Sequence, residues 1–392
     1  MFFVNLNNQR CNLKSWADSL DKKLPWENRL SIFRFVQNPL KYVTDEDEFD
    51  CLPDRIPLRH DVGMYFPAYD DYMDYYQFDK EINPEFIKRL ADKFQAYVNR
   101  GNINAKIEFY NLLKGFPIIN YHRDFINELA TRKVVITPQM KELGRWMVME
   151  TPDREVVKMG IILLGVSHDI ESIPLLKSIA KHGEFTYYVG LALYEMTPQW
   201  DLMLIDIIEP LYYWGRIMAV ILLLDYSPRE KVRKWCVRYG FRHNYLPDYN
   251  IEDCMKQGNV LKDMREEEWD EPLLRAVQAY VVFLLENTRY THENGGEVIR
   301  LYLKYTLGKR RGYVQFHIIQ SLYNFLNVAK NDKTLVENLN ISEEDYSDIW
   351  IDVHEEVQKP WFQKLLHEDC TYKTYPYTTQ ERLKKVIQDL GD

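Results

Sequence analysis

Apolar and polar positions between Thr151 and Gly240 follow a pattern that repeats three times. A strongly apolar segment is followed each time by an amphipathic one. New helices are expected after Asp169, Thr197 and Ser227, because a side-chain oxygen there can accept from the first backbone N–H groups of a helix. Thr137-Pro138 and Thr151-Pro152 repeat this capping pattern. The interval of about 30 residues is typical of helical pairs that bury their apolar faces by stacking. The pattern therefore predicts a helical-hairpin solenoid.

Helical periodicity extends to both sides of these repeats, and we see no convincing strand. The segment 64–78 is dense in tyrosine and aspartate. We interpret it as an irregular cap over the first solenoid helix, with a ligand-facing rim as the alternative. The predicted fold is all-α: an irregular N-terminal cap region at 1–83, HEAT-like helical repeats at 84–330 and a C-terminal helical cap at 331–392.

Charge and cysteine usage narrow the function classes. Fifty basic against 59 acidic residues give a net charge of −9, which makes nucleic acid an unlikely partner. An odd number of scattered cysteines indicates reduced thiols and a cytoplasmic protein. They are Cys11, Cys51, Cys236, Cys254 and Cys370. No targeting segment is apparent and no apolar run reaches the roughly 20 residues that span a bilayer. We therefore expect no membrane partner.

Common catalytic and nucleotide-binding motifs are absent from the sequence. Gly160 and Gly165 have the spacing of a phosphate-binding loop, but no Lys-Ser/Thr pair follows them. We expect these glycines to allow close helix packing. Ser167, His168 and Asp169 are adjacent in sequence and cannot form a catalytic triad, and Asp169 is expected to cap a helix.

Metal-ligand spacings are also absent, since neither HExxH nor ExxH occurs. The dipeptides His60-Asp61 and His168-Asp169 have a sparse similarity to metal-dependent phosphohydrolases. Two such dipeptides arise easily by chance, and we predict no metal site. The other histidines are expected on the surface or hydrogen-bonded in the core.

One basic segment is a candidate binding site. Six basic residues lie within fourteen positions, and Lys231, Lys234 and Arg238 share one face of a predicted helix. They could bind an anion: a phosphate, an acidic peptide or a nucleic-acid backbone. The alternative, which we favour, is that they pair with the acidic residues Glu266-Glu267-Glu268. The whole basic stripe comprises Arg229, Lys231, Arg233, Lys234, Arg238 and Arg242.

From Met1-Phe2-Phe3-Val4-Asn5-Leu6 through its Thr-Pro-capped hairpins, the chain resembles bacterial proteins that carry the name limonene hydroxylase. The resemblance implies a monooxygenase that hydroxylates this apolar monoterpene at an allylic carbon. It also implies oxidation of the resulting carveol or perillyl alcohol with NAD(P)H. Catalytic and cofactor-binding residues stay unassigned, because no motif with known roles carries over.

Two other functions remain open. A non-enzymatic HEAT-like scaffold would hold a protein partner on its concave face, and it needs no cofactor. An anion or nucleic-acid binder would use the Arg229–Arg242 stripe. Activation of oxygen, in contrast, needs a bound flavin, haem or metal, and the sequence shows no usual motif for one.

Overall fold

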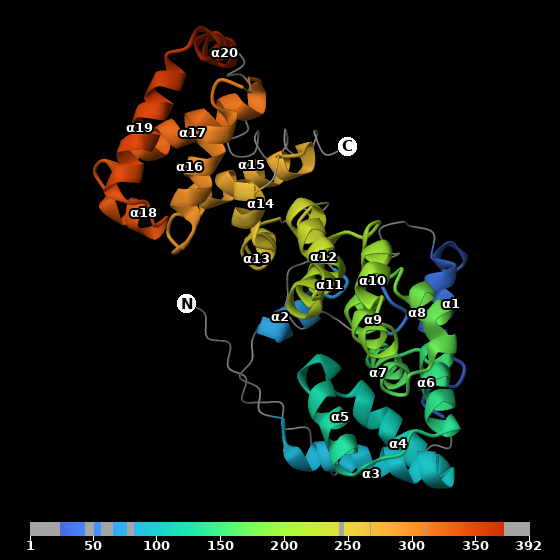
Figure 1. The fold of residues 1–392 in the computed structure, drawn as a ribbon. Helices are drawn as coiled ribbons and strands as arrows, with labels where there is room; N and C mark the ends of the chain where they lie inside the picture. Colours follow the sequence, from blue (N-terminus) through green and yellow to red (C-terminus); the bar gives the residue numbers. More distant parts are fainter. Residues whose placement is uncertain are drawn as a thin grey trace, which may run out of the picture. The chain divides into compact units, whose positions relative to one another are not determined.

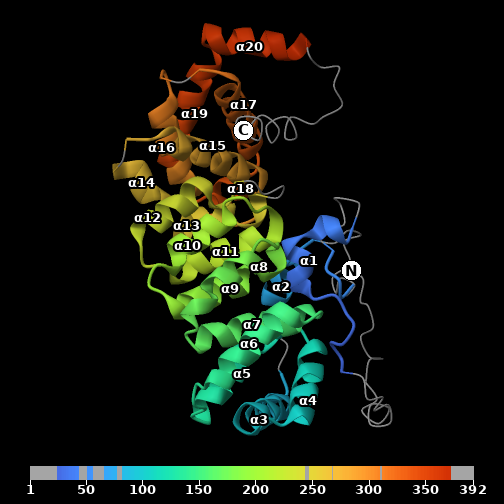
Figure 2. The same ribbon diagram turned by 90° about the vertical axis from the view of Figure 1, so that its right-hand side faces the viewer.

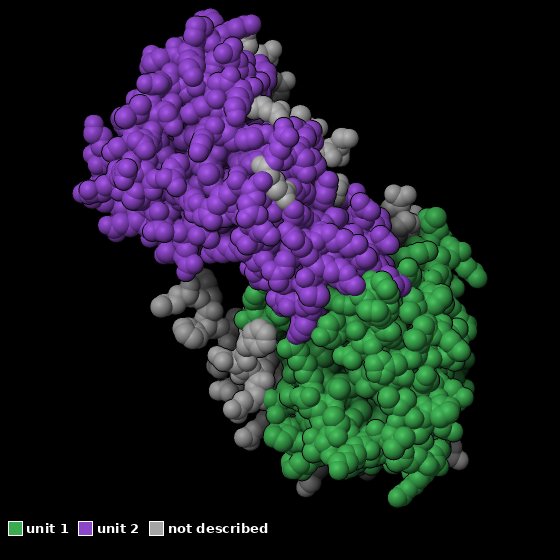
Figure 3. Space-filling model, in the orientation of Figure 1, with its two compact units in different colours: residues 1–200 green, residues 201–392 purple. Residues whose placement is uncertain are grey.

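The computed structural model describes residues 24–43, 51–55, 66–76, 82–242, 247–266, 268–309 and 311–371. Every regular element within these ranges is helical, and none of them is a strand (Figure 1). The all-α prediction is therefore confirmed at the level of fold class. The chain forms two compact units, residues 1–200 and 201–392 (Figure 3). The sequence predicted region boundaries at residues 84 and 331 instead. These boundaries stay predictions.

The first unit contains the elements that build the site described below. They are α1 (Ile32–Gln37), η1 (Pro39–Lys41), α2 (Tyr69–Tyr76), α3 (Pro84–Arg100), α4 (Ile103–Lys114), η3 (Ile118–Asn120), α5 (His122–Thr131), α6 (Pro138–Glu150), α7 (Arg154–Val166), η4 (Ile170–Ser172), α8 (Ile173–Ile179) and α9 (Gly183–Met196). Helix α7 packs against α6 on one side and α9 on the other, and the three lie side by side in Figures 1 and 2.

Glycines allow these three helices to approach closely. A Cβ at Gly160 would lie 2.7 Å from the Cβ of Met147 on α6, and a Cβ at Gly165 would lie 2.6 Å from the Cα of Ala192 on α9. Neither distance is compatible with a side chain unless a helix moves. The prediction that these glycines serve helix packing is confirmed.

A hydroxyl cap begins α6, as the sequence indicated. The side-chain oxygen of Thr137 accepts from the backbone N–H of Met140 at 3.3 Å, which satisfies one of the N–H groups that lack a partner in the first turn of a helix. The hydroxyl oxygens of Thr197 and Ser227 accept instead from Gln199 and Arg229, at 3.3 and 3.2 Å, and these two residues precede the helices that start at Trp200 and Glu230.

Two predicted caps are different in the structure. The Thr151 hydroxyl donates backward to the carbonyl of Met147, at 2.6 Å, and α7 begins only at Arg154. Asp169 precedes a helical turn, as expected, but its carboxylate makes no capping bond. It accepts instead from the guanidinium of Arg145, at 2.6 and 2.7 Å, because a charged donor outcompetes a backbone N–H.

The second unit continues with helices of similar length. Its elements are α10 (Trp200–Ile208, which starts at the last residue of the first unit), α11 (Tyr213–Tyr226), α12 (Glu230–Trp235), the π-helical turn η5 (Cys236–Gly240), η6 (Pro247–Tyr249), α13 (Ile251–Gln257), α14 (Val260–Glu266), α15 (Glu271–Glu286), α16 (Gly295–Thr306), α17 (Tyr313–Ala329), α18 (Lys333–Asn338), α19 (Glu343–Val357) and α20 (Pro360–Thr371). In the described ranges, no helix combines the length and the apolar character that crossing a bilayer requires.

Candidate functional site

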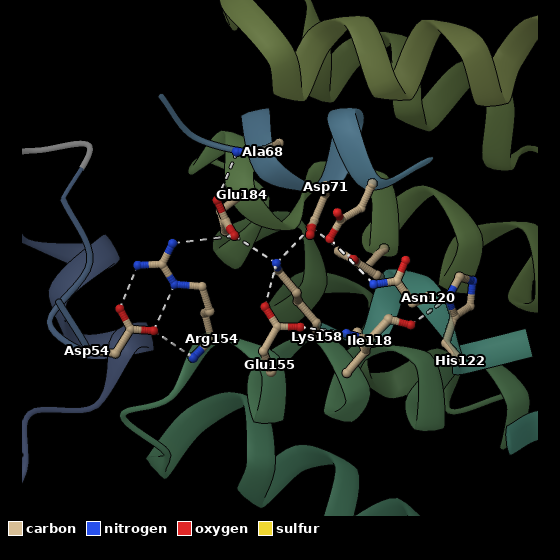
Figure 4. A network of polar contacts seen from close by, with 12 residues as sticks. Asp54, Ala68, Asp71, Ile118, Asn120, His122, Arg154, Glu155, Lys158 and Glu184 are labelled. Atoms are coloured by element: carbon tan, nitrogen blue, oxygen red, sulfur yellow. Dashed lines mark hydrogen bonds and ion pairs between the residues drawn. The ribbon is translucent and has the colours of Figure 1, made fainter. Parts of the chain in front are cut away.

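A lysine is buried in the middle of α7. Residues 154–165 of this helix are all buried, and Lys158 has no exposed surface. Its Nζ lies 2.7 Å from a carboxylate oxygen of Asp71, 2.7 Å from one of Glu184 and 3.0 Å from one of Glu155 (Figure 4). An ammonium group has three N–H donors, and here each has a carboxylate within reach. The carboxylates come from α2, α9 and α7.

A second ion pair lies one helical turn before this lysine. The guanidinium of Arg154 donates from Nε and Nη2 to Asp54, at 2.8 and 2.6 Å. The backbone N–H of Arg154 donates to the same carboxylate at 3.0 Å. Nη1 of Arg154 lies 3.7 Å from Glu184, so this glutamate lies between the two cations. We call Lys158, Arg154 and the carboxylates around them the Lys158 cluster; its acids are Asp54, Asp71, Glu155 and Glu184.

Backbone groups hold two of the carboxylates in place. The N–H of Ile118 donates to the second oxygen of Glu155, at 2.8 Å, and the N–H of Ala68 donates to the second oxygen of Glu184, also at 2.8 Å (Figure 4). A buried carboxylate costs free energy unless its lone pairs are occupied. These contacts therefore tie segments far apart in the sequence to α7 and α9.

The surroundings fix the protonation of Glu184 and Tyr188. Burial alone would raise the pKa of Glu184, but the charges of Lys158 and Arg154 outweigh it and hold the pKa well below its usual range. Burial, reinforced by the charge of Asp71, raises the pKa of Tyr188 well above its usual value. Tyr188 is thus a neutral donor, and its hydroxyl donates to Asp71 at 2.9 Å.

The three carboxylates that contact the lysine are also a potential ligand set. One oxygen each of Asp71, Glu155 and Glu184 lie within 4.8 Å of one another. Hard divalent cations prefer such oxygen donors. However, the ammonium of Lys158 already lies 2.7–3.0 Å from all three carboxylates. The cluster does not fit a metal ion while Lys158 stays in place.

Two buried polar atoms beside the cluster have no hydrogen-bond partner among the residues that the structure describes. They are the hydroxyl of Tyr121 and Nε2 of His122. The other ring nitrogen of His122 contacts the carbonyl of Ile118 at 3.0 Å, which agrees with the expectation of a hydrogen-bonded core histidine. Burial lowers the pKa of His122 to about 4, so the ring is neutral at physiological pH.

The predicted basic stripe does not form one uniform face. Helix α12 ends at Trp235 and gives way to a π-helical turn, which changes the angular spacing of the following residues. Lys231 is exposed, Lys234 is half-buried and Arg238 is buried.

Acidic neighbours pair with the stripe. Arg238 donates to Asp263 at 2.6 Å and to Asp270 at 3.0 Å. Lys234 lies 3.9 Å from Glu230. The acidic partners in these contacts are Asp263, Asp270 and Glu230, and pairing with Glu266-Glu267-Glu268 stays a prediction. Anion binding by Lys231, Lys234 and Arg238 stays a prediction.

The remaining histidine candidates are the two His-Asp dipeptides. His60-Asp61 lies outside the described residues. His168 is exposed and has a positive φ of 48°, whereas Asp169 is buried against Arg145. The prediction that the chain has no metal site stays a prediction.

Sequence reasoning did not single out the Lys158 cluster. The signal was present: Glu155 and Lys158 interrupt the apolar run of α7 at a spacing of three residues. A charged pair inside an otherwise buried helix needs partners from elsewhere. Those partners, Asp71 and Glu184, come from distant segments that periodicity cannot connect.

Comparison of the chain with protein-family models, with curated proteins and with solved structures found no match. The resemblance to limonene hydroxylase therefore stays a prediction. The same holds for the nicotinamide cofactor, the terpene substrate and the protein partner.

Proposed function

We propose that this protein is a HEAT-like helical-repeat scaffold that binds a protein partner along the concave face of its stacked helices. The observation that carries the proposal is the close packing of α6, α7 and α9 through Gly160 and Gly165. Helices that stack in sequence order and expose alternate surfaces are well suited to binding an extended partner.

The Lys158 cluster has a structural role in this proposal. Asp54, Ala68 and Asp71 belong to the segment before the predicted repeats, and all three contact charged groups of α7 or α9. A stack of repeats needs a cap over its terminal apolar surface. The expected irregular cap contains helix α2, which the sequence did not indicate, and the cluster fastens it in place.

Site-specific photocrosslinking in the native organism tests the scaffold. We would place a benzophenone amino acid at Tyr194 on α9, which is exposed, and in a control at Val135, an exposed residue before α6. The expected result is one defined partner that crosslinks at Tyr194 and not at Val135. That partner must then bind the purified chain in calorimetry. If no crosslink forms at Tyr194, or the purified partner does not bind, the scaffold proposal is wrong.

A second candidate is the monooxygenase that the resemblance implies. The observation in its favour is the convergence of Asp71, Glu155 and Glu184, an oxygen donor set of the kind that holds a divalent metal. Binding would require the ammonium of Lys158 to leave.

The test of the second candidate uses untagged protein. Its metal content, its visible absorption and its NADPH consumption with and without limonene would be measured. Bound metal or flavin together with limonene-dependent NADPH oxidation would establish the oxygenase. A colourless, metal-free protein without turnover would reject it.

A further inference from the structure

Helix α4 carries a lysine whose ammonium group faces aromatic rings. Nζ of Lys106 lies 3.3 Å from the centroid of a Trp146 ring, 5.2 Å from the ring of Tyr97 and 5.4 Å from that of Trp26. The rings come from α6, α3 and the segment before α1. Three aromatic faces thus surround one amine.

Contacts behind the rings keep this arrangement rigid. The Trp26 ring packs against Trp146, with centroids 4.7 Å apart, and against Tyr110 at 5.0 Å. The Tyr110 hydroxyl donates to Asp153 at 2.5 Å. Arg29, three residues after Trp26, donates two hydrogen bonds to the same carboxylate, at 2.7 and 2.8 Å. The bidentate pair fixes the segment that carries Trp26.

No carboxylate accompanies this amine among the described residues. No oxygen of an acid lies within 4.0 Å of Lys106 Nζ there, and no acceptor forms a hydrogen bond with it. Aromatic faces favour the ammonium form, whereas the loss of water disfavours it. Burial lowers the pKa of Lys106 from 10.5 to about 8. The residue as a whole is half-buried.

We propose that Lys106 is a nucleophilic amine that forms an imine with an aldehyde carrying an apolar or aromatic body. The surrounding rings of Trp26, Tyr97 and Trp146 would contact that body and orient the carbonyl group. Amines that lack water and an acidic partner are the lysines that react with carbonyl compounds. The site is independent of the scaffold proposed above.

The reaction is balanced without a redox partner. The lone pair of the neutral amine forms a bond to the carbonyl carbon, and the C=O π electrons move to the oxygen. Two protons from the nitrogen leave with that oxygen as water, and a C=N bond remains. Lysine and aldehyde therefore give imine and one water.

Reductive trapping on the full-length protein tests the proposal. Benzaldehyde and cyanoborohydride at neutral pH convert each imine into a stable benzylamine, which peptide mass spectrometry locates. Lys88 is the internal control, because it is exposed and paired with Glu85 at 2.9 Å, a contact that raises its pKa. A pKa of about 8 against 10.5 gives roughly three-hundredfold more neutral amine at neutral pH. Lower basicity offsets part of this gain, so we expect labelling of Lys106 about tenfold faster than of Lys88.

A second measurement tests whether contact with the rings, and not solvent exposure alone, determines the labelling of Lys106. Glyoxylate is a small charged aldehyde. The ratio of its labelling rates at Lys106 and Lys88 should be smaller than the ratio for benzaldehyde. Trp146→Leu should reduce the benzaldehyde preference at least about threefold while the labelling of Lys88 stays constant. The proposal is overturned if benzaldehyde labels Lys106 no faster than Lys88 in the wild-type protein. Equal preference for the two aldehydes would also overturn it, because the rings would then play no part.

Discussion

Helix α7 carries a fully buried lysine and α4 a half-buried one, and the two ammonium groups have opposite surroundings. Lys158 is completely buried and lies within 3.0 Å of three carboxylates. Lys106 is half-buried and faces three aromatic rings, with no carboxylate within 4.0 Å among the described residues. Both side chains lie in the first unit, where α7 packs against α6 and α4 packs against α7.

The difference shows what a buried amine needs in order to stay charged. Carboxylates at hydrogen-bond distance replace the water that Lys158 has lost, so its charge becomes part of the fold. Ring faces replace that water only in part, so Lys106 can lose its proton. The ion contacts give the first lysine a structural role, and the ring contacts of the second underlie the reactivity proposed above.

Removal of the Lys158 ammonium should have the largest effect. Lys158→Met leaves Asp71, Glu155 and Glu184 buried without their shared cation. Breaking a buried ion pair by removing one partner costs about 3–5 kcal/mol. We expect the free energy of unfolding, measured with urea, to fall by about this amount, with α2 released from α7 in hydrogen exchange.

Lys106→Met is the matched control. The same substitution removes an ammonium that has only ring contacts, which contribute about 1 kcal/mol or less at a partly exposed site. The free energy of unfolding of this variant should therefore be close to that of the wild type. If the two methionine variants lose equal stability, the contrast between the lysines is wrong.

Glu184 gives a second, smaller test. Its pKa is held below the usual range in the folded protein, so its contribution to stability is present above the unfolded pKa of about 4.5 and is lost as the pH falls further. Glu184→Gln keeps the shape but removes the charge, and we expect a loss of about 1–3 kcal/mol at neutral pH. Below pH 4 the difference from wild type should shrink.

Glu85→Gln serves as its control. Glu85 is exposed and pairs with Lys88 on the surface, a type of contact that contributes about 0–1 kcal/mol. Urea unfolding of both variants between acidic and neutral pH would distinguish the two sites. A Glu184→Gln difference that stays constant with pH would show that the carboxylate is not held ionised by the cations.

Local rules explain why part of this structure could be predicted. Helix class, the cap at Thr137 and the packing role of Gly160 depend on residues close together in the sequence. Such features follow from periodicity and capping chemistry.

Both lysine sites were missed because their contacts are non-local. Asp71 and Lys158 are 87 positions apart, and Asp54 and Arg154 are 100 apart. The aromatic rings around Lys106 likewise come from three separate segments. Asp169 shows a related limit: its position before a helical turn was predictable, but its preference for Arg145 over a backbone N–H depends on a residue of α6.

The pH dependence of stability gives the finest test of the contrast. Because the pKa of Lys106 is lower in the folded protein, about 8, than the ordinary value of 10.5, the unfolded chain binds more protons between these values. The contribution of Lys106 to stability must therefore rise as the pH rises from 8 to 10.5.

The free energy of unfolding of the wild type should therefore rise relative to that of Lys106→Met across this interval. The titratable rings beside Lys106, Tyr97 and Tyr110, have pKa values raised by burial, and their titration is common to both proteins. Urea midpoints of the two proteins at pH 7 and pH 10 measure the difference. A constant difference would mean that the rings keep Lys106 fully charged, and its amine would then be no more nucleophilic than that of a surface lysine.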